Sequence, residues 1–266
     1  MLPERGPASA PSANGSGSLT WRVIVDEALP GSANMARDHA LAACVRPGAG
    51  SVRFYQWAPA TLSFGRNEPV TVGYRELLRR HPLMGVVRRP TGGRAVIHDG
   101  ELTYSIAAPV RTFGALRLAY RKINEGLMEG LRRLGVDATG ATGRSLPPDA
   151  GPCFLEPAEG EVVVAGRKLV GSAQARIGGA LLQHGSLLLT ADQEALFPGA
   201  PPVGPVTLAE VLGDIPPWEH LVEAFNAGFS SVFGGKWVRS ALTEREAALA
   251  AELEKRYGSQ GWTWRR

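Results

Sequence analysis

The sequence predicts an α+β fold in which helices pack against a mixed, largely antiparallel sheet. Strand-like runs gather around residues 51–64 and 161–189, whereas helical periodicity is concentrated at residues 114–134 and near the end of the chain. Elements that cluster in this way, instead of alternating strand and helix, disfavour a doubly wound parallel sheet. The chain has 266 residues, of which 44% are hydrophobic and 20% charged, so it is long enough to bury a substantial core.

The first third of the chain contains four predicted strands and two predicted helices. Residues 19–25 alternate as a strand, and Ser32 is expected to cap a helix that runs to about residue 45. Strands over residues 51–57 and 60–64 flank Ala58-Pro59, which indicates a hairpin-like connection. A short helix over residues 74–80 and a strand over residues 84–89 follow.

The remaining elements also follow from local patterns. Residues 114–134 have apolar side chains at three- and four-residue spacing and form the longest predicted helix, with Gly135 as its C′ residue. Beyond a Pro/Gly-rich loop at residues 140–152, strands are expected near residues 161–164, 168–175 and 180–189. A turn at Gly166-Arg167 should join the first two strands as a hairpin. Helices over residues 217–233 and 243–256 complete the series.

Composition limits the organisation and the compartment of the protein. Residues 1–18 are rich in Pro, Ala, Ser and Gly, which predicts a disordered tail, and residues 19–266 are expected to form one domain with a helical C-terminal part. No apolar run has the length of a membrane span, and no signal peptide is evident. Two cysteines, Cys44 and Cys153, make no disulfide framework, which favours a cytoplasmic protein.

Charge and histidine usage narrow the classes of partner. The net charge of +4 and the pI near 9.3 suggest an acidic partner. A dense Lys/Arg stripe with interleaved aromatic residues is missing, so nucleic acid is not indicated. The five histidines show no metal-ligand spacing with cysteines or acidic residues, and no metal site is predicted.

The most informative segment is residues 88–105, RRPTGGRAVIHDGELTYS. Paired glycines allow backbone N–H groups to approach a ligand closely, and the flanking arginines and His98 would supply polar contacts. Short glycine loops are weak evidence by themselves, and a Gly-rich hairpin with a solvated basic flank explains the segment equally well.

A second segment, residues 166–186, reads GRKLVGSAQARIGGALLQHGS. Lys168 begins a strand with its amine free to lean into a cleft, and the small residues Gly171, Ser172 and Ala173 leave room for a thin ligand. Cys153 precedes this hairpin by a short loop, so contact with Lys168 is geometrically easy, and an ammonium stabilises a thiolate over a thiol. Taken alone, the lysine is more often an exposed turn residue and the cysteine a small buried hydrophobe.

Together these two segments resemble signatures of the biotin/lipoate protein ligase superfamily, in particular its lipoate-protein ligase A-like octanoyltransferases. Segment 88–105 is similar to RRxTGGRAVxHxxELTYS, and segment 166–186 to GxKxxGSAQxRxxxxxLQHGS. Residues 34–41, NMARDHAL, resemble the opening helix of that family, and residues 257–262, YGSQGW, its closing motif. The resemblance covers most of the chain and implies a catalytic domain of that superfamily.

The resemblance implies a cysteine thioester mechanism without ATP or another cofactor. Octanoate would pass from octanoyl-acyl carrier protein to Cys153, activated by Lys168, and then to a lysine of a lipoyl domain. That domain would belong to the glycine cleavage H protein or to a 2-oxoacid dehydrogenase E2, and the enzyme would be a monomer. Arg88, Arg89 and Arg94 are expected to form a docking patch for acidic partners. The implied substrate-binding residues are Arg88, Arg89, Thr91, Gly92, Gly93, Arg94, Ala95, Val96, His98, Gly171, Ser172, Ala173, His184 and Gly185.

Three alternatives remain open at this point. An ATP-dependent lipoate or octanoate ligase would use the same loop for an acyl-adenylate, with Cys153 incidental. An amidotransferase would move octanoate between lipoyl domains and would also use a cysteine. A non-enzymatic binding protein would keep the pocket without turnover, although the presence of both Cys153 and Lys168 disfavours it.

Overall fold

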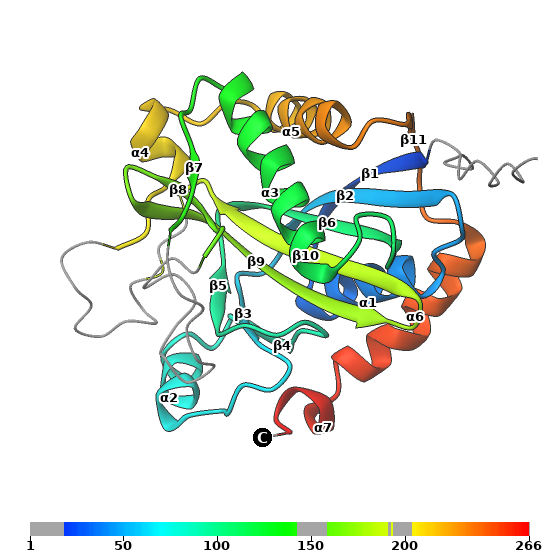
Figure 1. The fold of residues 1–266 in the computed structure, drawn as a ribbon. Helices are drawn as coiled ribbons and strands as arrows, with labels where there is room; N and C mark the ends of the chain where they lie inside the picture. Colours follow the sequence, from blue (N-terminus) through cyan, green and yellow to red (C-terminus); the bar gives the residue numbers. More distant parts are fainter. Residues whose placement is uncertain (1–18, 143–158, 191–192, 194–203, 266) are drawn as a thin grey trace, which may run out of the picture.

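Two sheets organise the computed structural model, which describes residues 19–142, 159–190, 193 and 204–265 (Figure 1). Within this part of the chain, an eight-stranded sheet has the order β11-β1-β2-β6-β10-β9-β8-β7 and a three-stranded sheet has the order β4-β3-β5. The predicted tail lies outside the described residues. The strands are β1 (Thr20–Leu29), β2 (Ala49–Trp57), β3 (Thr61–Phe64), β4 (Gly85–Arg88), β5 (Val96–His98), β6 (Glu101–Pro109), β7 (Thr139–Gly140), β8 (Val162–Val164), β9 (Arg167–Ile177), β10 (Ala180–Leu188) and β11 (Lys236–Arg239).

Helices cover both sides of the large sheet (Figure 1). The aromatic and aliphatic side chains of α3 and α5 pack on one side and form the largest hydrophobic core with β2, β6, β9 and β10. On the other side, α1 packs against β10 and β6 and is itself covered by α6. The helices are α1 (Gly31–Ala43), α2 (Val72–Arg80), α3 (Leu116–Arg133), α4 (Leu208–Leu212), α5 (Trp218–Phe233), α6 (Glu244–Tyr257) and α7 (Gln260–Thr263).

Strand directions confirm the predicted mixed, largely antiparallel sheet. β1 pairs in parallel with β2 and β11, and β3 pairs in parallel with β4. The centre of the large sheet, from β2 through β6, β10 and β9 to β8, is antiparallel throughout. Because β6, β10 and β9 lie side by side, residues far apart in the sequence meet on one surface.

The end of α3 confirms the prediction made for Gly135. This glycine has φ 81° and donates its N–H to the Arg132 carbonyl, while the N–H of Val136 bonds to the Leu131 carbonyl. Those two bonds define a Schellman motif, in which a residue with positive φ ends the helix at little steric cost.

Three local predictions are wrong. Ser32 lies inside α1, whose N-cap is Pro30 without a side-chain bond, so Ser32 does not cap the helix. The strands that flank Ala58-Pro59 are not a hairpin, because β2 belongs to the large sheet and β3 to the small one. The β8–β9 hairpin exists, but Val164 pairs with Arg167, which places its turn one residue earlier, at Ala165-Gly166.

Some elements have no counterpart in the prediction. The short strands β7 and β11 and the short helices α4 and α7 are each five residues or fewer. Such segments are too short for a periodic pattern to develop. No helix in the described part of the chain combines the length and the apolar character that crossing a membrane requires.

Candidate active site

A pocket lies between the β6–β10–β9 surface and the loop that leads into β5. Gly93, which is exposed, stands at its rim, and Met35 of α1 and Tyr55 of β2 are buried deeper. Nine of the predicted substrate-binding residues line this pocket: Arg89, Gly93, Val96, His98, Gly171, Ser172, Ala173, His184 and Gly185. Five other lining residues were not predicted: Met35, Tyr55, Trp57, Thr103 and Ser186.

Small residues let the backbone segments around the pocket approach closely. A Cβ added at Gly65 would lie 1.7 Å from the carbonyl oxygen of Gly93, and Gly93 itself has φ 86°. At the centre of the sheet, a Cβ on Gly185 would lie 2.5 Å from the Gly171 carbonyl oxygen. Real Cβ atoms essentially never approach so closely, so glycine is required at positions 65 and 185. At position 93, the positive φ favours glycine because other residues rarely adopt it.

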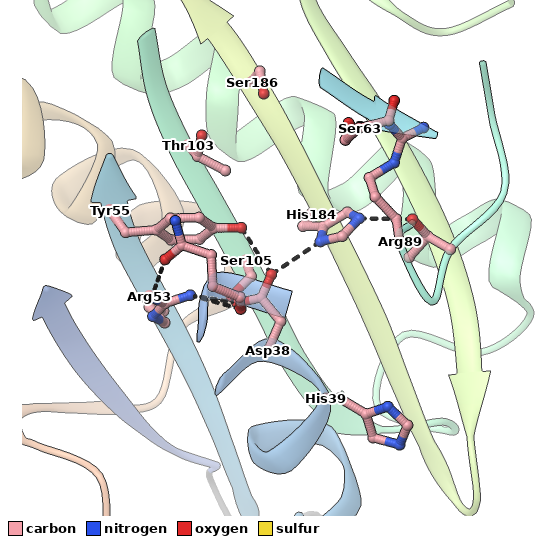
Figure 2. A network of polar contacts seen from close by, with 12 residues as sticks. Asp38, His39, Arg53, Tyr55, Ser63, Arg89, Thr103, Ser105, His184 and Ser186 are labelled. Carbon is pink, nitrogen blue, oxygen red and sulfur yellow. Dashed lines mark hydrogen bonds and ion pairs between the residues drawn. The ribbon is translucent and has the colours of Figure 1, made fainter. Parts of the chain in front are cut away.

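Asp38 is the centre of a buried polar network along one wall of the pocket (Figure 2). Its Oδ1 accepts hydrogen bonds from Arg53 Nη1 at 2.8 Å and from Ser105 Oγ at 2.7 Å. Its Oδ2 accepts from the Tyr55 hydroxyl at 2.8 Å and from His184 Nδ1 at 2.9 Å. Burial alone would raise the pKa of Asp38, but the His184 hydrogen bond and the Arg53 charge outweigh it and lower that pKa.

His184 links this network to the glycine loop. Burial lowers the pKa of His184, which favours a neutral ring. A neutral imidazole that donates from Nδ1 to Asp38 must accept at Nε2, where the Thr91 hydroxyl lies 2.6 Å away and donates. The Thr91 carbonyl in turn accepts the N–H of Arg66 at 2.7 Å. The buried aspartate therefore positions the loop that forms the rim of the pocket.

A second network surrounds His98 at the other end of the pocket. His98 Nδ1 lies 2.7 Å from Glu101 Oε1, and its Nε2 lies 2.6 Å from Ser63 Oγ. Glu101 Oε1 also accepts from Thr103 and from Ser186. The Trp57 indole stacks on the His98 ring, with 3.8 Å between the ring centroids.

These networks give the pocket an apolar interior despite its polar residues. The Trp57 N–H donates to Thr103 at 2.8 Å, and both ring nitrogens of His98 and of His184 have partners within the wall. Because the N–H and O–H groups bond one another, ring faces and aliphatic carbons are left to contact a ligand. A pocket of this kind suits an alkyl chain.

Arg88, Arg89 and Arg94 do not form the expected docking patch. They are 0%, 5% and 8% exposed, respectively. Arg88 donates to the carbonyl of Gly65 at 2.6 Å and of Thr263 at 2.9 Å, and Arg89 to the Arg94 carbonyl at 2.9 Å. A guanidinium has five N–H donors in a planar fork, so a buried arginine can bind several loop carbonyls at once. Arg88 and Arg89 therefore hold the loop in place from inside.

The other loop residues that were predicted to bind substrate do not line the pocket. Arg88, Thr91, Gly92, Arg94 and Ala95 do not line the pocket, although Thr91 is fixed by His184 as described above. The backbone N–H of Ala95 donates to Glu68 Oε1 at 2.8 Å, and Glu68 Oε2 accepts from Gly65. Glu68 therefore ties the two sides of the loop together, a role that no feature of the sequence indicated.

Lys168 is buried with a carboxylate partner. Lys168 is the second residue of β9, and its Nζ lies 2.7 Å from each carboxylate oxygen of Glu161. A register shift beside Lys168 leaves Leu169 as an extra residue on β9, and bulges of this kind change the direction of neighbouring side chains. The sequence suggested a free amine at Lys168. In the structure the amine is instead paired with Glu161. Cys153 lies outside the described residues.

The described residues contain no group of three or more His, Cys, Asp or Glu side chains placed to bind a metal ion. What they do contain is an α+β domain with a loop-rimmed apolar pocket and a buried lysine–glutamate pair. An apolar pocket of this kind has the chemistry to accept a slender apolar ligand.

Comparison with known proteins specifies the family. Residues 30–200 match the model of the lipoyl protein ligase A/B catalytic domain. The chain is 36% identical to octanoyltransferase LipM of Kyrpidia tusciae over 93% of its own length and 99% of that protein. It is 38% identical to octanoyltransferase LipM of Symbiobacterium thermophilum, with 92% and 98% covered. The protein belongs to the lipoyl protein ligase A/B catalytic-domain family.

Solved structures agree with this fold assignment. A lipoate-protein ligase A bound with ATP superposes with a TM-score of 0.77 at 24% identity, covering 92% of this chain and 99% of that chain. A bipartite lipoate protein ligase from Thermoplasma acidophilum, solved with its E2 lipoyl domain, gives a TM-score of 0.72 at 22% identity, with 92% and 96% covered. At this level of identity the likeness establishes the fold alone.

Proposed function

We propose that residues 19–266 act as one catalytic unit that transfers an octanoyl group from octanoyl-acyl carrier protein to a lysine of a lipoyl domain. The observation that carries this proposal is the apolar pocket, whose polar side chains bond one another and leave ring faces for an alkyl chain. Near full-length similarity to octanoyltransferases LipM supports the octanoyl group as the cargo.

In this proposal Cys153 carries the acyl group between donor and acceptor. Its thiolate attacks the carbonyl carbon of the octanoyl thioester, and the carbon–sulfur bond to phosphopantetheine breaks. The departing thiolate takes up a proton, and octanoate remains on Cys153 as a thioester. The target lysine, as a neutral amine, then attacks the same carbonyl, forms the amide and releases Cys153. A thioester is less stable than an amide, so no ATP is needed.

Lys168 would hold negative charge during both steps. It lies three residues before Gly171 on β9, which corresponds to roughly 10 Å along a strand. An ammonium at that distance from the pocket would face the thioester end of a chain whose alkyl part fills the pocket. It favours the Cys153 thiolate and then the oxyanion of each tetrahedral intermediate. Glu161 would hold this ammonium in position.

The acceptor and the compartment follow from the same chemistry. The lipoyl domain of the glycine cleavage H protein is the proposed first acceptor, with the E2 lipoyl domain as the other candidate. A catalytic thiol is maintained in a reducing environment, which places the reaction in the cytoplasm.

The proposed function is tested by intact-protein mass spectrometry. Purified protein is mixed with octanoyl-carrier protein without ATP, beside the variants Cys153→Ser and Cys44→Ser as matched thiol deletions. We expect a hydroxylamine-sensitive octanoyl adduct on the wild type and on Cys44→Ser, but none on Cys153→Ser, and transfer of the adduct to added H protein.

Two results would contradict the proposal. Octanoylation of H protein only when free octanoate and ATP are supplied, with Cys153→Ser still active, would identify an ATP-dependent ligase. Transfer from octanoyl-H protein to an E2 domain, but none from the carrier protein, would identify an amidotransferase.

A further inference from the structure

Two arginines near the end of the chain stack on the Trp262 indole, and a third arginine lies beside one of them. The guanidinium carbon of Arg256 lies 3.8 Å from the ring centroid, and that of Arg265 lies 3.6 Å from it. Two planar cations cannot occupy one face of a ring at such distances, so they sandwich the indole. Arg265 Nη2 also donates to the backbone carbonyl of Arg66 at 3.1 Å, which places the Arg66 backbone beside Arg265. We call Arg66, Arg256 and Arg265 the arginine cluster.

Two members of the cluster are exposed cations without a carboxylate. The guanidiniums of Arg66 and Arg256 have no hydrogen bond or ion pair with any residue in the described ranges. Some exposed arginines elsewhere in the chain do have a carboxylate partner, for example Arg132 and Arg133, which both pair with Glu129. Stacking on Trp262 fixes the plane of Arg256 and leaves its N–H edge available to a ligand.

The local field agrees with an uncompensated positive charge. Burial lowers the pKa of His39, and the charges of Arg256 and Arg66 lower it further. His39 is half-buried, and its Nδ1 lies 2.7 Å from the Tyr257 hydroxyl. Figure 2 shows its ring turned away from the Asp38 network.

The arginine cluster flanks the rim of the pocket. The Arg66 N–H donates to the Thr91 carbonyl at 2.7 Å, and the preceding Gly65 packs directly against Gly93 at the rim. From the side of α1, His39 is one helical turn beyond Met35, which lines the pocket. A substrate whose alkyl chain occupies the pocket would therefore pass this cluster on its way out.

We propose that the arginine cluster binds the phosphate of the phosphopantetheine arm of the acyl donor. The inference rests on the proposed function, because that donor carries its octanoyl group on such an arm. The planar fork of a guanidinium matches two phosphate oxygens, and the phosphate is a compact anion that two neighbouring arginines can share. The acceptor lysine carries no phosphate, so the site distinguishes the donor from the acceptor.

The test compares three octanoyl donors on a double variant. Arg66→Gln with Arg256→Gln removes two charges from the cluster, and Arg132→Gln with Arg133→Gln removes two exposed arginine charges elsewhere as the matched control. The donors are octanoyl-pantetheine, octanoyl-4′-phosphopantetheine and octanoyl-carrier protein. The cluster variant should raise KM roughly tenfold for the two donors that contain phosphate, with kcat unchanged. Its KM for octanoyl-pantetheine and for the lipoyl domain should stay at the wild-type value.

Several results would overturn the inference. They are an equal rise in KM for the control variant, no rise for either phosphate-containing donor, or a rise for the carrier protein alone. The last result would assign the arginines to carboxylates of the carrier instead of its phosphate. Calorimetric titration with free 4′-phosphopantetheine and with pantetheine needs no turnover, and only the former should bind, with loss in the cluster variant. Inactivity of the wild type toward all three donors would instead refute the proposed function.

Discussion

Replacement of Asp38 by asparagine tests whether one buried carboxylate supports both the fold and the rim of the pocket. The carboxylate accepts four hydrogen bonds, two at each oxygen. An amide has only one acceptor oxygen, so two donors must lose their partner. The less costly orientation keeps oxygen toward Arg53 and turns the NH₂ group toward Tyr55 and His184. The His184 proton must then move to Nε2, where it faces the Thr91 hydroxyl.

The expected loss of stability is about 3 kcal/mol. Removal of one partner from a buried ion pair costs about 3–5 kcal/mol, because the other charge stays buried. Arg53 keeps part of its compensation, since its Nε lies 2.6 Å from Asp26 and its Nη2 lies 2.8 Å from Asn34 Oδ1. The cost should therefore fall at the lower end of that range. In a chain of this size it corresponds to a decrease in Tm of roughly 6–12 °C.

Urea denaturation followed by circular dichroism measures this loss, with Asp26→Asn as the matched control. The control removes a carboxylate from the same Arg53 but leaves His184 and the loop untouched. Both variants should lose stability, whereas only Asp38→Asn should slow octanoyl transfer, because only Asp38 positions Thr91 through His184. A loss below about 1 kcal/mol for Asp38→Asn, or an equal loss of transfer rate in both variants, would refute this reasoning.

The same carboxylate should make stability depend on pH in acid. The pKa of Asp38 is lower in the folded protein than in the unfolded chain, so its contribution is complete above the unfolded value of about 4. That contribution is lost as the pH falls through the folded pKa, which lies below the unfolded one. The stability difference between wild type and Asp38→Asn should therefore shrink when denaturation is repeated below pH 4. A difference that stays constant down to pH 2 would contradict the lowered pKa.

Three further predictions follow from the pocket and its surroundings. Trp57→Val removes the indole that stacks on His98 and enlarges the pocket. Each additional CH₂ that the enlarged pocket buries contributes about 0.8 kcal/mol. The kcat/KM for a decanoyl donor, relative to that for an octanoyl donor, should therefore rise about tenfold. Glu161→Gln removes the Glu161 carboxylate from the buried Lys168 ammonium, which should cost about 3 kcal/mol in urea denaturation and lower the rate of single-turnover transfer. Gly65→Ala forces a Cβ against the loop carbonyl, so the loop must move and octanoyl-donor KM should rise.

Each of these variants has a matched control elsewhere in the chain. Trp237→Val removes another partly buried indole, which does not line the pocket, and should leave chain-length preference unchanged. Glu129→Gln breaks an exposed pair and should leave stability close to that of the wild type. Gly73→Ala places a Cβ in ordinary contact within α2 and should be tolerated. A variant that behaves like its control would refute the corresponding assignment.

Elements with local causes could be predicted from the sequence. The helix α3 was found because its apolar residues recur every three or four positions, and its end because Gly135 supplies a positive φ. The β8–β9 hairpin was also found, although its turn is Ala165-Gly166, with φ values of 49° and 77°. Alanine rarely adopts a positive φ, so the sequence pointed to the wrong pair of residues.

The burial of charged residues could not be predicted because it depends on partners far along the chain. Arg88 is bound by carbonyls that lie 23 and 175 residues away, and a sequence pattern cannot show that these loops converge. The motif containing Asp38 was found as part of a helix, yet its role depends on His184, 146 residues later. Trp57 was placed in a strand, but only the stacking on His98 makes it part of the pocket.

The alternation at residues 102–106 shows why a correct strand prediction can still miss the function of a surface. Alternation of polar and apolar residues usually means that one face of a strand is solvated. Here both faces are buried: Leu102, Tyr104 and Ile106 belong to the hydrophobic core with α3 and α5, whereas Thr103 and Ser105 point to the opposite side. On that side they meet their cross-strand neighbours on β10, Ser186 and His184, and join the two polar networks.

The hydrogen-bonded walls of the pocket hold their shape more firmly than walls of aliphatic side chains would. Hydrogen bonds between fixed donors and acceptors hold each side chain in one orientation, whereas leucine or valine side chains repack at little cost. The pocket thus combines an apolar interior with walls whose shape is set by directional bonds. Such a pocket should discriminate chain length sharply, and a variant that breaks a bond without changing volume, such as Thr103→Val, should broaden chain-length preference while leaving octanoyl transfer active.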